Sequence, residues 1–228
     1  MVADAPVPFV DPRTIILLTG IMGGLMSVVL YFLRRSYPPR VKGLGEWSFA
    51  TALLFFAGLA AASRGKSHDL VSITLANFLI FSGCYFQYIG SQRFFGKVPR
   101  VAPGLLVIGA LVLVSGWFTV VDPNYRPRLM ISVLVMTSLF SAHALLIYAN
   151  GPRSFAHWFS FGVLLAAIVS QLLRFFTAWW YPPGTGVLDN TPQNLIYIIA
   201  YPFVMLLFAI SLVLLATDRV RTEFEHMV

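Results

Sequence analysis

The chain has 228 residues, of which 58% are hydrophobic and only 11% are charged. Soluble domains average about 45–50% apolar and about 25% charged residues, so this composition excludes a soluble fold and indicates an integral membrane protein. The formal net charge of +7 comes from basic residues between apolar segments, which predicts membrane orientation rather than nucleic-acid binding. Cys84, the one cysteine, lies in an apolar segment and excludes an intrachain disulfide.

Seven segments are long and apolar enough to cross a membrane as helices. They are separated by short connections that contain Pro, Gly or Asn, so the sequence predicts an all-α, polytopic protein with no large loop domain. In chain order the segments are Thr14–Leu33, Trp47–Ala62, Leu70–Ile89, Pro103–Val121, Leu129–Ala149, Phe155–Trp180 and Gln193–Thr217.

Lys and Arg divide unequally between the two sides of this arrangement. With the N-terminus outside, ten basic residues fall on the inner side and five on the outer side, and Arg174 alone remains within a helix. Because inner loops carry the excess of Lys and Arg, we expect the N-terminus outside and the C-terminus inside. The basic residues Arg34, Arg35, Arg40 and Lys42 would then lie against anionic lipids of the inner leaflet.

The seventh segment continues past Thr217 without a Gly or Pro to end it. Apolar or small residues recur there with a spacing of four and three, which is typical of a coiled coil and predicts a dimeric stalk. The alternative is an amphipathic tail that lies on the membrane surface. The residues of this seam are Val213, Thr217, Val220, Phe224 and Met227.

Three charged or mixed stretches are distinctive. Residues 33–47 read LRRSYPPRVKGLGEW, residues 76–79 and 90–96 read ANFL and GSQRFFG, and residues 216–226 read ATDRVRTEFEH. With these stretches the chain resembles the seven-helix N-terminal sensory regions of bacterial GGDEF diguanylate cyclases. In that family the exit helix leads into a cytoplasmic GGDEF domain, which makes cyclic di-GMP from two GTP.

The resemblance implies a sensory domain over residues 1–217 in the bacterial inner membrane, and the start of a linker to an output domain over residues 218–228. The sequence contains no GGDEF motif, so no catalytic residue is assigned and the chain itself is not expected to be an enzyme. Since two GGDEF domains must face each other, the resemblance also implies a homodimer through the stalk. A ligand would act by favouring one of two dimer arrangements.

Arg174 is the strongest candidate for a ligand-binding residue, because a cation at membrane depth is costly and marks a function or a partner. Gln171 shares its helix face, and other polar residues fall in the same leaflet, so we expect an outward-facing pocket for an anionic or lipidic small molecule. Alternatively, Arg174 extends to the interface and Gln171 bonds a neighbouring helix. The remaining pocket candidates are Asn77, Gln193, Asn194 and Tyr197.

His143 and His157 lie seven residues on either side of Asn150, at similar depth in two successive helices. Two facing imidazoles would suit a haem or metal, which defines an alternative function as a membrane redox sensor. The simpler interpretation is two histidines hydrogen-bonded between helices, with no cofactor. A retinal protein is excluded, because Lys42, Lys66 and Lys97, the only lysines, lie in loops. A small-solute transporter stays open as a further alternative, although no paired halves are visible.

Overall fold

The computed structural model describes residues 11–181, 184, 186–189 and 191–225, with the side chains of Gln193, Glu223 and Phe224 excepted. Over these residues the fold is all-helical, and seven helical segments are long and apolar enough to cross a membrane, as the sequence predicts. The elements in order are α1 (Pro12–Ser36), α2 (Leu44–Ala62), the π-helical turn η1 (Leu70–Leu75), α3 (Ala76–Phe94), α4 (Val101–Val120), α5 (Tyr125–Asn150), α6 (Phe155–Trp180) and α7 (Pro192–Glu225).

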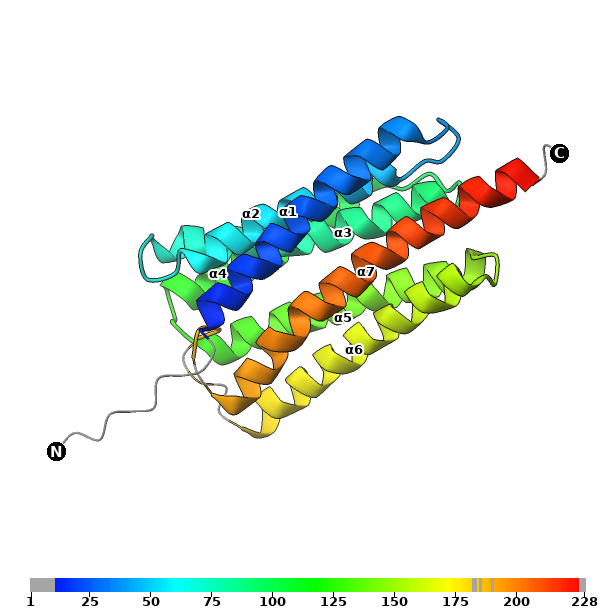
Figure 1. The fold of residues 1–228 in the computed structure, drawn as a ribbon. Coiled ribbons are helices and arrows are strands. Elements are labelled where there is room, and N and C mark those ends of the chain that lie inside the picture. The colour runs from blue at the N-terminus through cyan, green and yellow to red at the C-terminus, as the bar shows by residue number, and fades with distance from the viewer. Residues whose placement is uncertain (1–10, 182–183, 185, 190, 226–228) are drawn as a thin grey trace.

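The helices run side by side along one bundle (Figure 1), and the contacts between them close six of the helices into a ring. In the order α1, α2, α3, α5, α6 and α7 each packs against the next, and α7 returns to α1. Helix α4 lies outside this ring, against η1, α3 and α5. Helix α1 begins at one end of the bundle, here called the N-terminal end, and α7 finishes at the other, here called the C-terminal end. Which end faces the cytoplasm stays a prediction.

Polar caps set where several helices begin. The side chain of Asp11 accepts a hydrogen bond from the Arg13 amide at 3.0 Å, and that of Asn124 accepts one from the Arg126 amide at 3.2 Å. Such caps satisfy amides that have no partner within the helix. Helix α5 therefore begins at Tyr125, four residues before the predicted Leu129. The expectation that Arg174 is the one arginine within a helix is wrong, because other arginines lie in the end turns of α1, α3, α5 and α7, among them Arg126 and Arg128 in the first turn of α5.

Helices α1 and α2 approach closely through glycine. A Cβ atom on Gly58 would lie 2.8 Å from the Cα atom of Gly20, and one on Gly20 would lie 3.2 Å from the Cα atom of Gly58. Small residues allow membrane helices to bring their backbones together in this way. Gly20 therefore serves packing within the chain.

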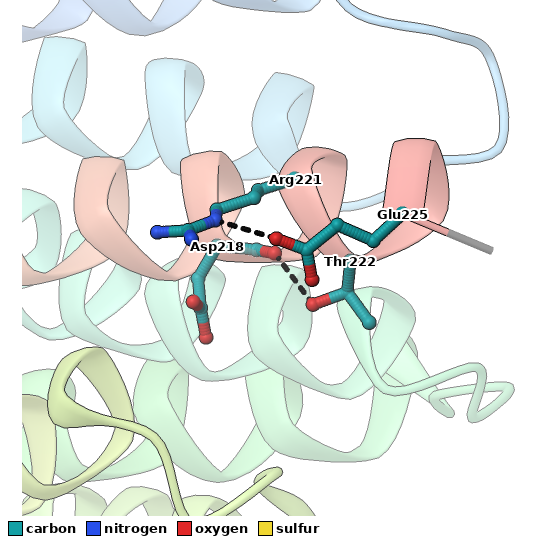
Figure 2. A network of polar contacts seen from close by, with 4 residues as sticks. All are labelled: Asp218, Arg221, Thr222 and Glu225. Carbon is teal, nitrogen blue, oxygen red and sulfur yellow. Dashed lines mark hydrogen bonds and ion pairs between the residues drawn. The ribbon is translucent and has the colours of Figure 1, made fainter. Parts of the chain in front are cut away.

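Helix α7 spans the whole bundle. Its 34 residues extend over about 51 Å at 1.5 Å per residue, which exceeds the hydrocarbon thickness of about 30 Å. Toward the C-terminal end Leu212, Leu215 and Ala216 are almost fully buried. Beyond them the helix continues, with an Arg221–Glu225 ion pair and a Thr222 hydroxyl that donates to the Asp218 carbonyl (Figure 2).

The predicted stalk seam is partly used within the chain. Val213 and Val220 pack against a core to which α1, α2, α3, α5, α6 and α7 contribute. The Thr217 hydroxyl lies 3.1 Å from the Tyr37 hydroxyl. Met227 and the side chain of Phe224 lie outside the described residues. The homodimer through this seam stays a prediction.

Candidate functional site

A cavity of about 200 Å³ lies inside the helix ring, in the half toward the N-terminal end. All six ring helices contribute side chains to its lining, together with η1 and Val187 from the connection between α6 and α7. Helix α4 contributes none among the described residues. The ring helices therefore line the cavity, and α4 packs against η1, α3 and α5 from outside.

Three arginines line the end of the cavity nearest the N-terminal end of the bundle. They are Arg64, just after α2, Arg128 in the first turn of α5, and Arg174 near the end of α6. No Asp or Glu is among the described residues that line the cavity. Three positive charges without a lining carboxylate create a site for an anion, because guanidinium groups bind carboxylate and phosphate oxygens with paired hydrogen bonds.

Arg64 is held by the backbone of η1, since its Nε donates to the Ser72 carbonyl at 3.2 Å. The pKa of Arg64 is lowered to about 10, mainly by burial. The positive charges of Arg128 and Arg174 contribute to the lowering, and Tyr125 and Asp69 act in the opposite direction. The guanidinium nonetheless stays protonated at neutral pH. Arg64 therefore lies close enough to Arg128 and Arg174 to feel their charges, and a bound anion would offset this repulsion.

Arg128 has donor capacity that the protein does not use. One terminal nitrogen donates to the Thr119 hydroxyl at 3.3 Å, and the guanidinium carbon lies 5.7 Å from the centroid of the Tyr125 ring. Its buried Nε has no hydrogen-bond partner in the protein, and neither has the buried hydroxyl of Tyr125. Unpaired buried donors are costly, so these two groups beside the cavity indicate a polar ligand.

Arg174 is positioned by α7. Its terminal nitrogen Nη2 donates to Oδ1 of Asn194 at 3.4 Å, and its guanidinium lies over the Tyr197 ring. The amide nitrogen of Asn194 donates in turn to the carbonyls of Val187 at 2.7 Å and Asp189 at 2.9 Å. Asn194 therefore connects the arginine, the start of α7 and the segment that closes this end of the cavity.

Away from the arginines the cavity is lined by apolar side chains. Leu54, Phe81, Val133, Met136 and Met205 form this deeper part. The cavity is therefore amphipathic, with cations at one end and hydrocarbon at the other. Sites of this kind bind ligands with a polar group and an apolar body.

The cavity includes four of the six residues predicted from the sequence: Asn77, Gln171, Arg174 and Tyr197. Asn194 lies behind them as the partner of Arg174, and the side chain of Gln193 is outside the described residues. The amide nitrogen of Asn77 also donates to the Ser115 hydroxyl on α4 at 3.4 Å.

Sequence reasoning missed Arg64 and Arg128, which it placed in outer loops. For Arg128 the sequence did contain a signal that the helix begins earlier, in the residues around Arg128. Asn124 is a typical N-cap, and Pro127 is tolerated in a first helical turn, so α5 could have been extended toward Arg128.

The two predicted cofactor histidines have separate surroundings. Nε2 of His143 lies 2.6 Å from the Ser91 hydroxyl, and the His143 ring packs edge-on against Tyr88 and Phe208. The ring of His157 packs against Trp158, and its buried Nδ1 has no hydrogen-bond partner. Within the described part of the chain no three His, Cys, Asp or Glu side chains form a group suited to a metal ion. Haem or metal binding stays a prediction.

Comparison of the chain with protein-family models, with curated proteins and with solved structures finds no match.

Proposed function

We propose that the chain is a membrane sensory domain that binds an organic anion in the arginine-lined cavity and transmits its occupancy along α7. The observation that carries the proposal is the convergence of Arg64, Arg128 and Arg174 on one cavity that no described Asp or Glu lines. Asp69 acts electrostatically on Arg64 and Arg128 but does not line the cavity, so the three guanidinium groups keep hydrogen-bond donors available for a ligand.

Helix α7 is suited to carry the signal, because it joins the cavity to the far end of the bundle. Tyr197, Ile198, Tyr201 and Met205 line the cavity, and the same helix continues to Glu225. The buried Pro202 lies among these residues. Proline removes a backbone hydrogen bond and allows a helix to bend locally, so a ligand beside Pro202 could shift the exit segment.

The family resemblance supports the direction of the signal. In that interpretation the N-terminal end of the bundle faces outward, α7 leads into the cytoplasm of a bacterium, and the output is a GGDEF domain that makes cyclic di-GMP. The stalk would act as a homodimer whose two arrangements differ in affinity for the anion.

Binding and transmission are tested separately on the 228-residue chain in lipid nanodiscs. Thermal unfolding is followed with sodium octanoate, benzoate, succinate and phosphate, because a ligand of the folded state raises the unfolding temperature. Stabilisation by at least one anion, lost in Arg174→Gln, supports the site. No stabilisation by any of the four overturns it.

Transmission is measured as the distance between spin labels on Lys97→Cys and Arg221→Cys, in a Cys84→Ala background. Both labelled side chains are exposed, and they report on the loop after α3 and the exit of α7. A shift in the distance distribution when the stabilising anion is added supports signalling through α7. An unchanged distribution with a saturated site would show that the cavity binds without moving the exit helix.

A further inference from the structure

Resting on the proposed function, we infer that the ligand is a medium-length amphiphilic acid, whose carboxylate meets the three arginines and whose alkyl tail extends toward Met205. The cavity supports this class through the separation of its polar and apolar parts. Arg64, Arg128 and Arg174 lie at one end, and Leu54, Met136 and Met205 at the other.

The size of the cavity limits the ligand. Its volume is about 200 Å³, whereas a cavity of about 150 Å³ in another protein accommodates benzene. A simple inorganic anion would occupy only the arginine end and leave the apolar part unfilled. A two-chain phospholipid exceeds this volume and could place only part of itself in the cavity. A single acid with a short or medium alkyl chain matches both the chemistry and the volume.

A second, smaller cavity of about 30 Å³ continues in the direction of the tail. It is lined by Cys84, Phe140, Val163 and Phe208 among others, and it shares Leu54, Tyr201 and Met205 with the first cavity. These three shared side chains separate the two cavities. The space beyond them lies inside the bundle, toward its C-terminal end.

Met205 is the side chain in this partition best able to move. Methionine is unbranched and adapts its shape readily, whereas leucine and tyrosine are more restricted. The Met205 methyl group reaches α1, since a Cβ on Gly23 would lie 2.7 Å from it. A tail that displaces Met205 would join the two cavities and press directly on α7. Met205 therefore sets the longest tail that the resting cavity accepts.

The test measures dissociation constants on the chain in nanodiscs of zwitterionic lipid for propionate, hexanoate, octanoate, decanoate and dodecanoate. 1-Octanol is the neutral counterpart of octanoate, and phosphate is the headgroup control. For each ligand, the signal measured with the Arg128→Gln variant is subtracted from that of the unmodified chain, which leaves the part that depends on this arginine. We expect affinity to rise roughly tenfold for each added pair of buried methylenes, from about 0.8 kcal/mol per methylene, and then to level off. Octanol should bind at least tenfold more weakly than octanoate.

In the variant Met205→Ala the affinity should stop rising only at a longer acid, because the side chain that separates the two cavities is removed. Leu207→Ala is the matched control, since Leu207 lies on the same helix but is 42% exposed. If Met205→Ala fails to fold, the length series and the octanol comparison on the unmodified chain still decide the matter.

Other outcomes separate this inference from the proposed function. If phosphate or propionate binds as tightly as octanoate, with Arg128 dependence, the tail assignment is wrong and the anion sensor stands. If octanol binds as tightly as octanoate, the assignment of the headgroup to the arginines is wrong. If none of the acids nor phosphate binds, both the inference and the proposed function fail.

Discussion

The guanidinium carbon of Arg174 on α6 lies 5.7 Å from the centroid of the Tyr197 ring on α7. The Tyr197 hydroxyl also lies 3.2 Å from the Thr177 hydroxyl, so the ring is attached to α6 at two places. An anion that binds beside Arg174 would therefore act on the contact between α6 and α7, and α7 continues to the C-terminal end of the bundle.

The Tyr197 ring should contribute to anion binding through its face. We expect Tyr197→Leu to weaken octanoate binding by about threefold to tenfold, because a cation over an aromatic ring gains about 0.5–2 kcal/mol of stabilisation. Tyr197→Phe keeps the ring and loses only the hydroxyl contact to Thr177, so its affinity should stay close to that of the unmodified chain. Calorimetric titration measures both. Equal losses in the two variants would show that the hydroxyl matters and the ring does not.

Arg128 should be essential for binding, and its neighbour Arg126 should not. Arg128 lines the cavity with an unpaired Nε, whereas Arg126 is exposed and donates to the Trp179 carbonyl. We expect Arg128→Gln to weaken octanoate binding at least tenfold, since a hydrogen bond to a charged group contributes about 1.5–3 kcal/mol. Arg126→Gln, two residues away on the same turn, is the control. Similar losses in the two variants would indicate a general effect of charge at this end of the bundle.

The pH dependence of octanoate binding should follow the acid rather than the protein. Burial and the neighbouring cations lower the pKa of Arg64 to about 10, which leaves the guanidinium charged throughout the neutral range. We therefore expect constant affinity between about pH 6 and pH 9, and a decline below about pH 5 as the carboxylate is protonated, in the range where carboxyl side chains titrate. Titrations at several pH values measure this. A transition between pH 6 and 8 would point to a histidine instead.

Gly58 should tolerate no side chain. An added Cβ would lie 2.8 Å from the Cα of Gly20, so we expect Gly58→Ala to destabilise the chain by about 1–3 kcal/mol through overpacking. Gly162 on α6 has nothing within 4 Å of an added Cβ, so Gly162→Ala should stabilise the helix by about 0.5–1 kcal/mol. Unfolding in denaturant measures both changes, and a neutral Gly58→Ala would contradict the close approach of α1 and α2.

The Ser91 hydroxyl should stabilise the bundle by satisfying His143. Removing it leaves the buried Nε2 of His143 without this partner, so Ser91→Ala should cost about 1–3 kcal/mol. The Ser91 hydroxyl also accepts a hydrogen bond from the Trp47 indole nitrogen at 3.2 Å, but that nitrogen donates to the Gln87 carbonyl at 3.1 Å as well, so Trp47 keeps a partner in the variant. Ser141→Ala on α5 is the control. A Soret band in the purified chain that disappears in His143→Ala would instead support the haem alternative.

The sequence predicted the helices well and the site in part. Arg174, Gln171, Asn77 and Tyr197 were identifiable because a polar residue inside an apolar segment is conspicuous. Arg64 and Arg128 were not, because the same rule places any charge near a segment end in a loop. Their convergence depends on which helices are neighbours in the ring, and hydropathy carries no information on that order.

The side chains that separate the two cavities could not be predicted from the sequence either. Leu54, Tyr201 and Met205 occur in continuous apolar stretches, where lipid-facing and cavity-facing residues have the same composition. Only the packing of α2 against α3 and of α7 against α1 distinguishes them.

The contact between Gly20 and Gly58 has a mechanical consequence. It brings the backbones of α1 and α2 into direct contact, so this side of the cavity is rigid. Helices α6 and α7 meet at the cavity through side chains instead, where Arg174 lies over the Tyr197 ring. A ligand in the cavity would therefore displace α7 and leave α1 in place. Helix α1 is then the natural reference for any measurement of motion.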